Sequence, residues 1–332
     1  MVEMNDLAKL SRNLYNGVNV NFNEVSGDDA MRNMIADALG MKPGDEIEYY
    51  AWEDNKTKVF RIIGTALDAV IPVRLEKQFN ALADFRNTAF GDTNEFEVKD
   101  NSLLRVGLVA AGTQDLQRQQ IFGHKFTVST DWYGGKVYAD FERFMAGKVD
   151  WKELVDRLSK SFEEFVQTAI YKGFMGNYTT LGANYTANGA YDEDKLFNLI
   201  QYIETASGGK KVAVYGSRSL LRHITKSLGA EMSNNMKDER NKLGYLTTMG
   251  GVDFHVIPQA FNRKGEYAID DNKLLVLPQG EKLVAVVTEG KAIVNDTDEL
   301  ASNGLEKEFV ILKKLGVQVN KMAQYGIYDV TR

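Results

Sequence analysis

Two stretches of alternating apolar and polar residues, separated by a polar segment, most constrain how this chain can fold. The second stretch, "KFTVSTDWYGGKVYADF", places Phe126, Val128, Thr130 and Trp132 on one face of a strand. The first stretch, "EFEVKDNSLLRVGLVAAG", alternates similarly, and "GTQDLQRQQ" lies between the two. We therefore expect one long β-ribbon from about residue 96 to residue 141, with a polar tip. Each arm would extend roughly 35–40 Å.

A two-stranded ribbon of that length is only marginally stable alone in water, because one layer of strands buries little apolar area. It needs a surface to pack on. That surface belongs either to the same subunit or to a neighbouring subunit, and the alternation leaves both alternatives open.

Composition excludes several kinds of functional site. The 332 residues include no cysteine, so disulfides, thiolate nucleophiles and cysteine–zinc centres are excluded. The histidines, His124, His223 and His255, lie too far apart for a helical metal pair. A net charge of −6 argues against a protein that binds nucleic acid by neutralising phosphates, although it permits one that encloses nucleic acid. No signal segment or membrane-spanning run is present, which indicates synthesis in the cytoplasm.

Helical patterns mark two segments in the first half of the chain. Residues 1–58 are polar and interrupted by glycine, and they predict an arm with one short helix at "DDAMRNMIADALG". The clearest helix is "DWKELVDRLSKSFEEFVQTAIYKGFMG", with Asp150 as N-cap and Glu153 at the capping-box position. Its apolar residues recur every three to four positions, which places Glu163 and Glu164 on the solvent side. The loop "GNYTTLGANYTANG" after it reads as a flexible connection.

From about residue 195 to residue 295, helical and strand patterns alternate and predict a compact sheet with helices. The tail "EKEFVILKKLGVQVNKMAQYGIYDV" is strand-like and is expected to return to the first body.

Recognisable catalytic motifs are absent from the sequence. Ser217 in "VAVYGSRSLL" lies on a strand-to-helix turn, but it lacks the flanking glycines of a nucleophile elbow, so a helix N-cap is the better interpretation. Neither type of glycine-rich phosphate loop occurs. We predict no catalytic, cofactor-binding or metal-binding residue and no cofactor. A soluble α/β enzyme with an unrecognised site in residues 195–295 is the alternative from another functional class.

The order of these elements resembles the major capsid proteins of tailed bacteriophages with the Hong Kong 97 fold. The resemblance rests on that order and on "GDTNEFEV", "FTVSTDWYGGKVYADFERFMAGKVDW", "GGVDFHVIPQ" and "LLVLPQGEKLVAV", from about residue 60 to the end. It implies an α+β fold. The implied parts are an N-terminal arm at 1–58, a peripheral domain from 59–89, 143–194 (with the spine helix) and 299–332, an extended β-ribbon loop at 90–142, and an axial α/β domain at 195–298.

The resemblance also implies a function, which is a structural and non-enzymatic one. The chain would assemble with itself into hexamers and pentamers, forming an icosahedral phage head that encloses double-stranded DNA without binding it tightly. The ribbon would lie over a neighbouring subunit. The implied inter-subunit contacts are Phe126, Val128, Trp132, Val137 and Phe141.

Further partners implied by the resemblance are a portal protein and separate scaffolding and decoration proteins, with no membrane. Because only a short arm precedes the body, we expect any scaffold to be a separate chain. The product would be located in the virion after synthesis in the host cytoplasm. An encapsulin-like shell that encloses cargo proteins is the alternative with the same fold.

Overall fold

The structure is a computed structural model that describes residues 27–42, 45–98, 104, 106, 118, 123–140, 151–225, 232–262, 264–296, 306–320 and 324–331. The chain divides into two compact units. The first unit comprises Met1–Asn94, Val128–Gln167 and Ala285–Val317, and the second comprises Glu95–Thr127, Thr168–Val284 and Gln318–Arg332. Helix α5 and strands β10 and β11 contribute residues to both units.

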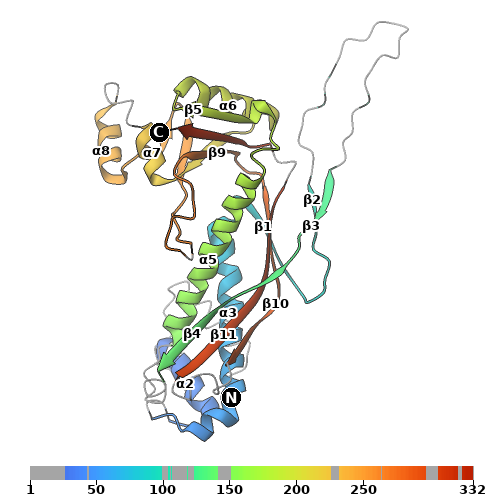
Figure 1. Ribbon diagram of the computed structural model, residues 1–332, viewed down its shortest axis with the longest axis vertical. Coiled ribbons are helices and arrows are strands. Elements are labelled where there is room, and N and C mark those ends of the chain that lie inside the picture. Colours follow the sequence, from blue (N-terminus) through green and yellow to red (C-terminus); the bar gives the residue numbers. More distant parts are fainter. Residues whose placement is uncertain are drawn as a thin grey trace. The chain divides into compact units, whose positions relative to one another are not determined.

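The first unit contains a four-stranded sheet with helices. The strand order is β1 (Ala83–Thr88), β10 (Val284–Asp296), β11 (Glu306–Val319) and β4 (Asp131–Asp140). β4 pairs antiparallel with β11, from Asp131 opposite Leu315 to Asp140 opposite Glu306. The sheet is accompanied by α2 (Gly27–Leu39), α3 (Tyr49–Phe79) and the first part of α5 (Trp151–Gly176), and α3 and α5 run side by side (Figure 1).

Helix α3 begins before the expected end of the N-terminal arm. The sequence places a boundary at residue 58, but α3 runs unbroken through it. Trp52 is fully buried, and its ring makes edge contacts with Phe60 of the same helix and with Phe309 of β11. The polar residues of this part also have partners, since Lys56 bonds to both Glu53 and Asp296. One buried indole and these ion pairs anchor a segment whose average composition looks like a solvated arm.

Helix α5 confirms the predicted spine helix. The predicted apolar face is buried at Val155, Leu158, Phe162, Val166 and Ile170. Asp150, the predicted N-cap, lies outside the described residues. The prediction of a solvated carboxylate pair is wrong at Glu163, whose side chain is 26% exposed and faces Arg74 of α3.

The second unit is built around a six-stranded sheet. Its order is β5 (Thr186–Ala190), β12 (Gly326–Thr331), β9 (Lys273–Pro278), β6 (Val212–Gly216), β8 (Val252–Val256) and β7 (Thr248–Met249). The pairs β5–β12 and β6–β8 are parallel, and the other pairs are antiparallel. Helices α6 (Glu193–Ala206), α7 (Arg218–Ile224) and α8 (Asn234–Leu243) accompany the sheet.

The core of the second unit is apolar. Leu196, Leu199, Ile200 and Ile203 of α6 pack with strand residues such as Val214, and all of them are buried. As predicted, Ser217 caps α7, because its hydroxyl accepts a hydrogen bond from Leu220 N at 3.2 Å. The expected region of alternating helices and strands is therefore confirmed here.

Three strands fall elsewhere than the sequence suggests. β10, which lies within the expected 195–295 sheet, pairs with β1 and β11 in the first unit. β12, which the tail pattern assigns to the first body, joins the six-stranded sheet, where Ile327, Tyr328 and Val330 are buried. The supposed flexible loop after α5 contains the short helix η1 (Ala183–Tyr185) and β5. All three errors involve pairings between residues that are far apart in the sequence.

The second arm of the ribbon ends earlier in the sequence than expected. β2 (Glu95–Val98) pairs antiparallel with β3 (His124–Thr127), with Phe96 opposite Phe126. Residues 128–130 belong to no strand, and the following residues form β4 in the other sheet. The alternation from residue 125 to residue 141 is thus two strands in two sheets. Among the described helices, none is long and apolar enough to cross a membrane.

Candidate assembly interface

The two ends of segment 95–127, which carries the ribbon, are fixed side by side in the first unit. The amide of Val128 donates a hydrogen bond to the carbonyl oxygen of Asn94 at 3.1 Å. Both residues are buried, at 3% and 4% exposure. We call this point, with the residues that hold it, the ribbon base. The residues that flank segment 95–127 on both sides are therefore held together by a backbone hydrogen bond in the first unit.

Glu289 of β10 ties three segments together at the ribbon base. Its carboxylate accepts hydrogen bonds from Gly91 N at 2.9 Å, from Lys314 Nζ at 2.8 Å and from the Thr130 hydroxyl. The Gly91 amide, the Lys314 ammonium and the Thr130 hydroxyl all favour the ionised form and lower the pKa of Glu289 to about 2. A charge buried at 3% exposure is tolerated because it is fully hydrogen-bonded.

An aromatic contact continues the ribbon base toward β4. The ring of Phe90 lies over Gly290, where an added Cβ would be 2.2 Å from the Phe90 ring. Gly290 also has a φ of 64°, so any other residue there would be both crowded and strained. Phe90 in turn packs on Trp132 of β4, with ring centroids 5.7 Å apart. Both rings stay about half exposed, at 52% and 47%.

Lys313 lies beside this network in the interior of the first unit. Its side chain is 1% exposed, and its Nζ bonds to Asp68 of α3 at 2.7 Å and to the carbonyl of Gly290 at 2.6 Å. Asp68 also accepts from Ala292 N at 2.9 Å. Helix α3 is thereby locked to the strand that carries Glu289.

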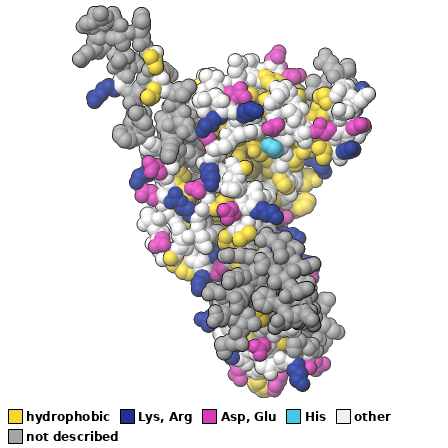
Figure 2. Space-filling model, turned by 180° about the vertical axis from the view of Figure 1, so that it is seen from behind, with side chains coloured by type: hydrophobic (Ala, Val, Ile, Leu, Met, Phe, Trp, Pro, Cys, Tyr) yellow, Lys and Arg dark blue, Asp and Glu magenta, His cyan; other side chains and the backbone are white. Residues whose placement is uncertain are grey.

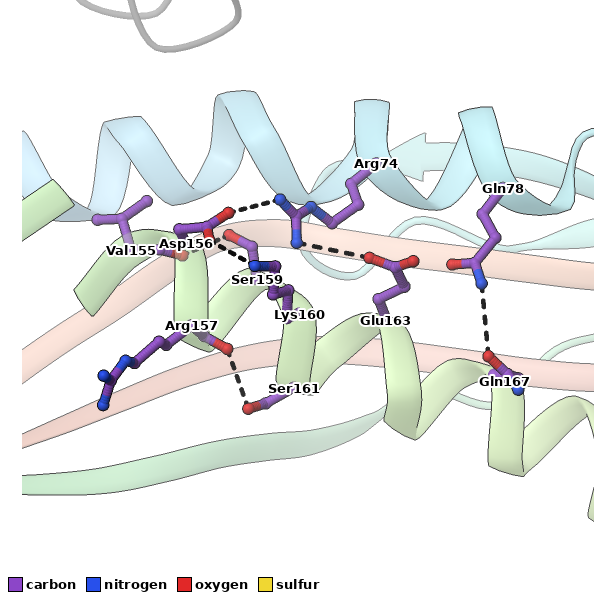
Figure 3. Close-up of polar contacts among 10 residues, drawn as sticks. All are labelled: Arg74, Gln78, Val155, Asp156, Arg157, Ser159, Lys160, Ser161, Glu163 and Gln167. Carbon is purple, nitrogen blue, oxygen red and sulfur yellow. Dashed lines mark hydrogen bonds and ion pairs between the residues drawn. The ribbon is translucent and has the colours of Figure 1, made fainter. Parts of the chain in front are cut away.

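A second polar seam joins α3 to α5 (Figure 3). Arg74, buried at 6% exposure, pairs with Asp156 at 2.6 Å and with Glu163 at 3.5 Å. Burial opposes the ionised form of Asp156, but hydrogen bonds from Lys160 and Arg74 outweigh it and lower its pKa. For Glu163, burial dominates over the attraction of Arg74 and raises the pKa. One turn further along, Gln78 donates to Gln167 at 3.4 Å. The seam fixes the lengthwise register of the two helices.

Strand β4 presents two different faces at the edge of the four-stranded sheet. One face packs inward: Tyr133 lies 4.3 Å from the Phe165 ring of α5, and Val137 is half-buried. The other face is open, with Trp132 47% and Tyr138 67% exposed. An edge strand with exposed aromatic residues is a surface on which another chain can pack.

The ribbon strands hold each other by local contacts. Phe96 and Phe126 stack at 5.7 Å, and Lys125 pairs with Glu95 at 3.4 Å. Among the residues of segment 95–127 that the structure describes, Leu104 is 55% and Val106 is 97% exposed. The subunit does not cover these side chains.

The predicted contact residues therefore divide into groups. Val128 is buried within its own subunit, and Val137 is half-buried on the inward face of β4. Phe126 is half-buried against Phe96, Trp132 is exposed, and Phe141 lies outside the described residues.

Sequence reasoning missed the buried charges Arg74, Glu289 and Lys313. For Glu289 and Lys313 the sequence carried a signal, because "VAVVTEG" in β10 and "FVILKKLG" in β11 contain charged residues inside otherwise apolar runs.

Nothing in the described part of the chain is arranged for catalysis with a metal. No group of three or more His, Cys, Asp or Glu residues there could hold a metal ion. The serine that the sequence brings to a strand-to-helix turn, Ser217, is 1% exposed and occupied as a helix cap.

Solved structures with the same fold come from phage-like particles. The mature capsid of bacteriophage PhiM1 is 13% identical with a TM-score of 0.50, covering 76% of this chain and 87% of that one. The capsid of cyanophage P-SCSP1u is 11% identical with the same TM-score, covering 76% and 88%. The capsid of a native GTA particle is 12% identical with a TM-score of 0.50, covering 77% and 90%. These similarities confirm the mixed α+β capsid fold.

Sequence comparison identifies the family. Among curated proteins, none matches the chain. A family model described as "SPbeta prophage-derived putative capsid protein YonB" matches residues 23–327, which is most of the chain. The chain therefore belongs to the YonB family of prophage-derived capsid proteins and has a structural role in a capsid.

Proposed function

We propose that this protein is the major subunit of an icosahedral phage head, assembling into hexamers and pentamers that enclose double-stranded DNA. The observation that carries the proposal is the pair of uncovered apolar surfaces on one subunit. These are the open face of β4, with Trp132 and Tyr138, and the ribbon segment with Leu104 and Val106. A neighbouring subunit that covers them supplies the partner that the ribbon requires.

The energetics favour assembly through many modest contacts. Burying one large apolar side chain contributes about 1.5–3 kcal/mol, so a few such residues per contact suffice when the contact is repeated around a closed ring. Of the predicted contacts that the structure describes, Trp132 and Phe126 are the ones proposed for this role. The ribbon base and the α3–α5 seam fix the first unit, which carries the open face of β4, before assembly. This lowers the entropy cost of association.

We propose that the shell encloses DNA without binding it tightly. Acidic residues outnumber basic ones, 46 to 40. On the face shown in Figure 2, side chains of both charges are interspersed over the described surface, with no field of one sign. Tight binding of duplex DNA requires clustered Lys and Arg. A portal and separate scaffolding and decoration proteins would complete the particle in the virion.

Electron microscopy of the purified protein tests this proposal. We expect closed shells from the parent protein. A variant lacking residues 99–123, with β2 and β3 joined by a short turn, should stay folded but form no shells. A matched control replaces only residues 107–117 by a glycine–serine linker of equal length, so that Leu104 and Val106 remain, and should still assemble. Normal shells from the deletion variant would refute the role of the ribbon.

The contents of the particle and the size of the subunit separate the alternatives. Shells purified from cells should contain duplex DNA, whereas protein cargo in place of DNA would support the encapsulin-like alternative. A stable monomer or dimer under every assembly condition would refute both kinds of shell. Such a result would favour the alternative of a soluble α/β enzyme.

A further inference from the structure

A hollow in the second unit is lined by residues of α7 and α8 and by Gln259, Tyr267 and Asp271. Its volume is about 1140 Å³, which is at or above the upper end of the range for small-molecule sites. It lies apart from both surfaces considered above, and none of the features described so far accounts for it.

Five cationic side chains line this hollow, namely Arg218, Arg222, Lys237, Arg240 and Lys242. None of them forms an ion pair with any residue that the structure describes. Elsewhere in the described chain, cations such as Lys210, Lys273 and Lys313 are paired with carboxylates. Five like charges gathered with one carboxylate among the described lining residues repel one another, so an anionic partner would be favoured there.

Among the described lining residues, Asp271 is the one carboxylate, against five cations. Asp271 accepts a hydrogen bond from the Gln259 side-chain amide at 3.0 Å. The other side-chain atom of Gln259, Oε1, is a buried acceptor without a partner among the described atoms. The lining therefore offers an unused hydrogen-bond acceptor as well as five unpaired cations.

The rim of the hollow favours a protein partner over a phosphate. Leu243 and Tyr267 are 38% and 63% exposed, and Tyr267 stacks on the exposed Phe261 at 5.5 Å. Arginine and exposed aromatic side chains together are typical of protein–protein interfaces. A phosphate would use the cations alone and would leave the apolar rim in water.

The second unit also carries a surface of the opposite charge. Asp192, Glu193 and Asp194 are three consecutive exposed carboxylates at the start of α6, and they do not line the hollow of their own subunit. The Asp192 side chain accepts from Asp194 N at 3.0 Å, which fixes the turn. Glu193 and Asp194 form no ion pair within the described residues.

We propose that the hollow receives the acidic turn 192–194 of a second copy of this chain. Each subunit then carries both a socket and its complement, so the contact is head-to-tail and closes into a ring when the rotation per subunit permits. This rests on the proposed shell function and deepens it, because it names a contact that sets the order of subunits around a ring. Charge complementarity of this kind selects the correct partner and orientation.

A charge-swap experiment tests the pairing. The socket variant carries Arg222→Glu and Lys237→Glu, and the turn variant carries Glu193→Lys and Asp194→Lys. Each juxtaposes like charges, so the protein concentration needed for shell formation should rise about tenfold or more. The variant with all four changes restores opposite charges and should recover most of the assembly. Circular dichroism and melting curves establish that every variant is folded.

A matched control carries Lys172→Glu and Lys211→Glu, two exposed lysines of the second unit that do not line the hollow. It makes the same change in net charge and should assemble like the parent. Normal shells from the socket variant would overturn this proposal alone, and so would a fourfold variant as defective as the socket variant. Absence of shells from the parent would overturn the proposed function and this proposal with it. Binding of a duplex oligonucleotide that the socket variant loses would assign the hollow to DNA instead.

Discussion

The two units bury different kinds of residue. In the first unit, Arg74, Glu289 and Lys313 are charged and at most 6% exposed, and each is held by several polar partners. In the second unit, the buried polar residues that the structure describes are uncharged, namely Ser207, Ser217, Thr225 and Asn320. The difference shows that the first unit depends on specific contacts at fixed positions. The second unit is stabilised mainly by apolar packing.

Buried charges add little net stability but penalise the wrong arrangement strongly. Slippage of α3 along α5 would separate Arg74 from its carboxylates, and movement of the ribbon base would leave Glu289 without its donors. An apolar core tolerates such shifts better, because apolar contacts are not directional. The first unit, which holds the two ends of the ribbon segment, is therefore the unit whose interior contains directional polar contacts.

The largest expected losses of stability are of the same size in the two units. Phe162→Ala in the first unit and Phe254→Ala in the second should each lower the free energy of unfolding by about 3–5 kcal/mol, because both rings are at most 5% exposed. Urea denaturation measures the loss. Glu164→Ala, on the exposed side of α5, should cost less than about 0.5 kcal/mol. A cost below about 1 kcal/mol for Phe162→Ala would mean that the buried face of α5 is misassigned.

Removing one partner of a buried charge should affect the first unit specifically. Asp68→Ala leaves the Lys313 ammonium buried with only a carbonyl partner, and we expect a loss of about 3 kcal/mol. The double change Asp68→Leu with Lys313→Met replaces the pair by apolar groups and should recover the part of this loss that comes from the buried charge, although Ala292 N still loses its acceptor. If the double variant is no more stable than Asp68→Ala, an uncompensated charge is not the cause.

Sequence patterns predicted the elements whose burial is local. The apolar face of α5, the Ser217 cap and strands such as β6 follow directly from periodicity and helix-capping rules. Arrangement of the strands in sheets did not follow, because pairing is set by contacts between distant segments. The sequence of β12 has the same strand pattern whichever sheet the strand joins.

The candidate interface was predicted only in part. Trp132 is 47% exposed in the subunit, so its predicted contact with a neighbour stays a prediction. Glu163 was assigned to solvent because its partner Arg74 lies 89 positions earlier, which no helical repeat can indicate. The break in alternation at residues 128–130 was invisible for the same reason: its cause is the bond to Asn94 and the contact with Glu289.

The charge at the ribbon base should make the first unit sensitive to acid. The pKa of Glu289 is lowered from 4.5 to about 2, so its contribution is fully present above pH 4.5 and is lost as the pH falls toward 2. Glu289→Gln keeps an acceptor but loses the charge, and should cost about 1–2 kcal/mol at pH 7. Unfolding curves of parent and variant should converge as the pH falls through this window. A constant difference between them at every pH would contradict the role of the charge.

The smallest effect on the subunit should come with the largest effect on assembly. Trp132→Ser removes a ring that is 47% exposed and touches only Phe90 among the aromatic contacts described, so the subunit should lose less than about 1 kcal/mol. Tyr133→Ser, the next residue, removes the ring that packs on Phe165 and should destabilise the subunit more. We expect the Trp132 variant to melt within a few degrees of the parent and to form few or no shells, because only the assembled state buries that face of β4. A Trp132 variant that assembles normally would show that the open face of β4 is not an inter-subunit surface. One that unfolds would show that Trp132 stabilises the first unit itself.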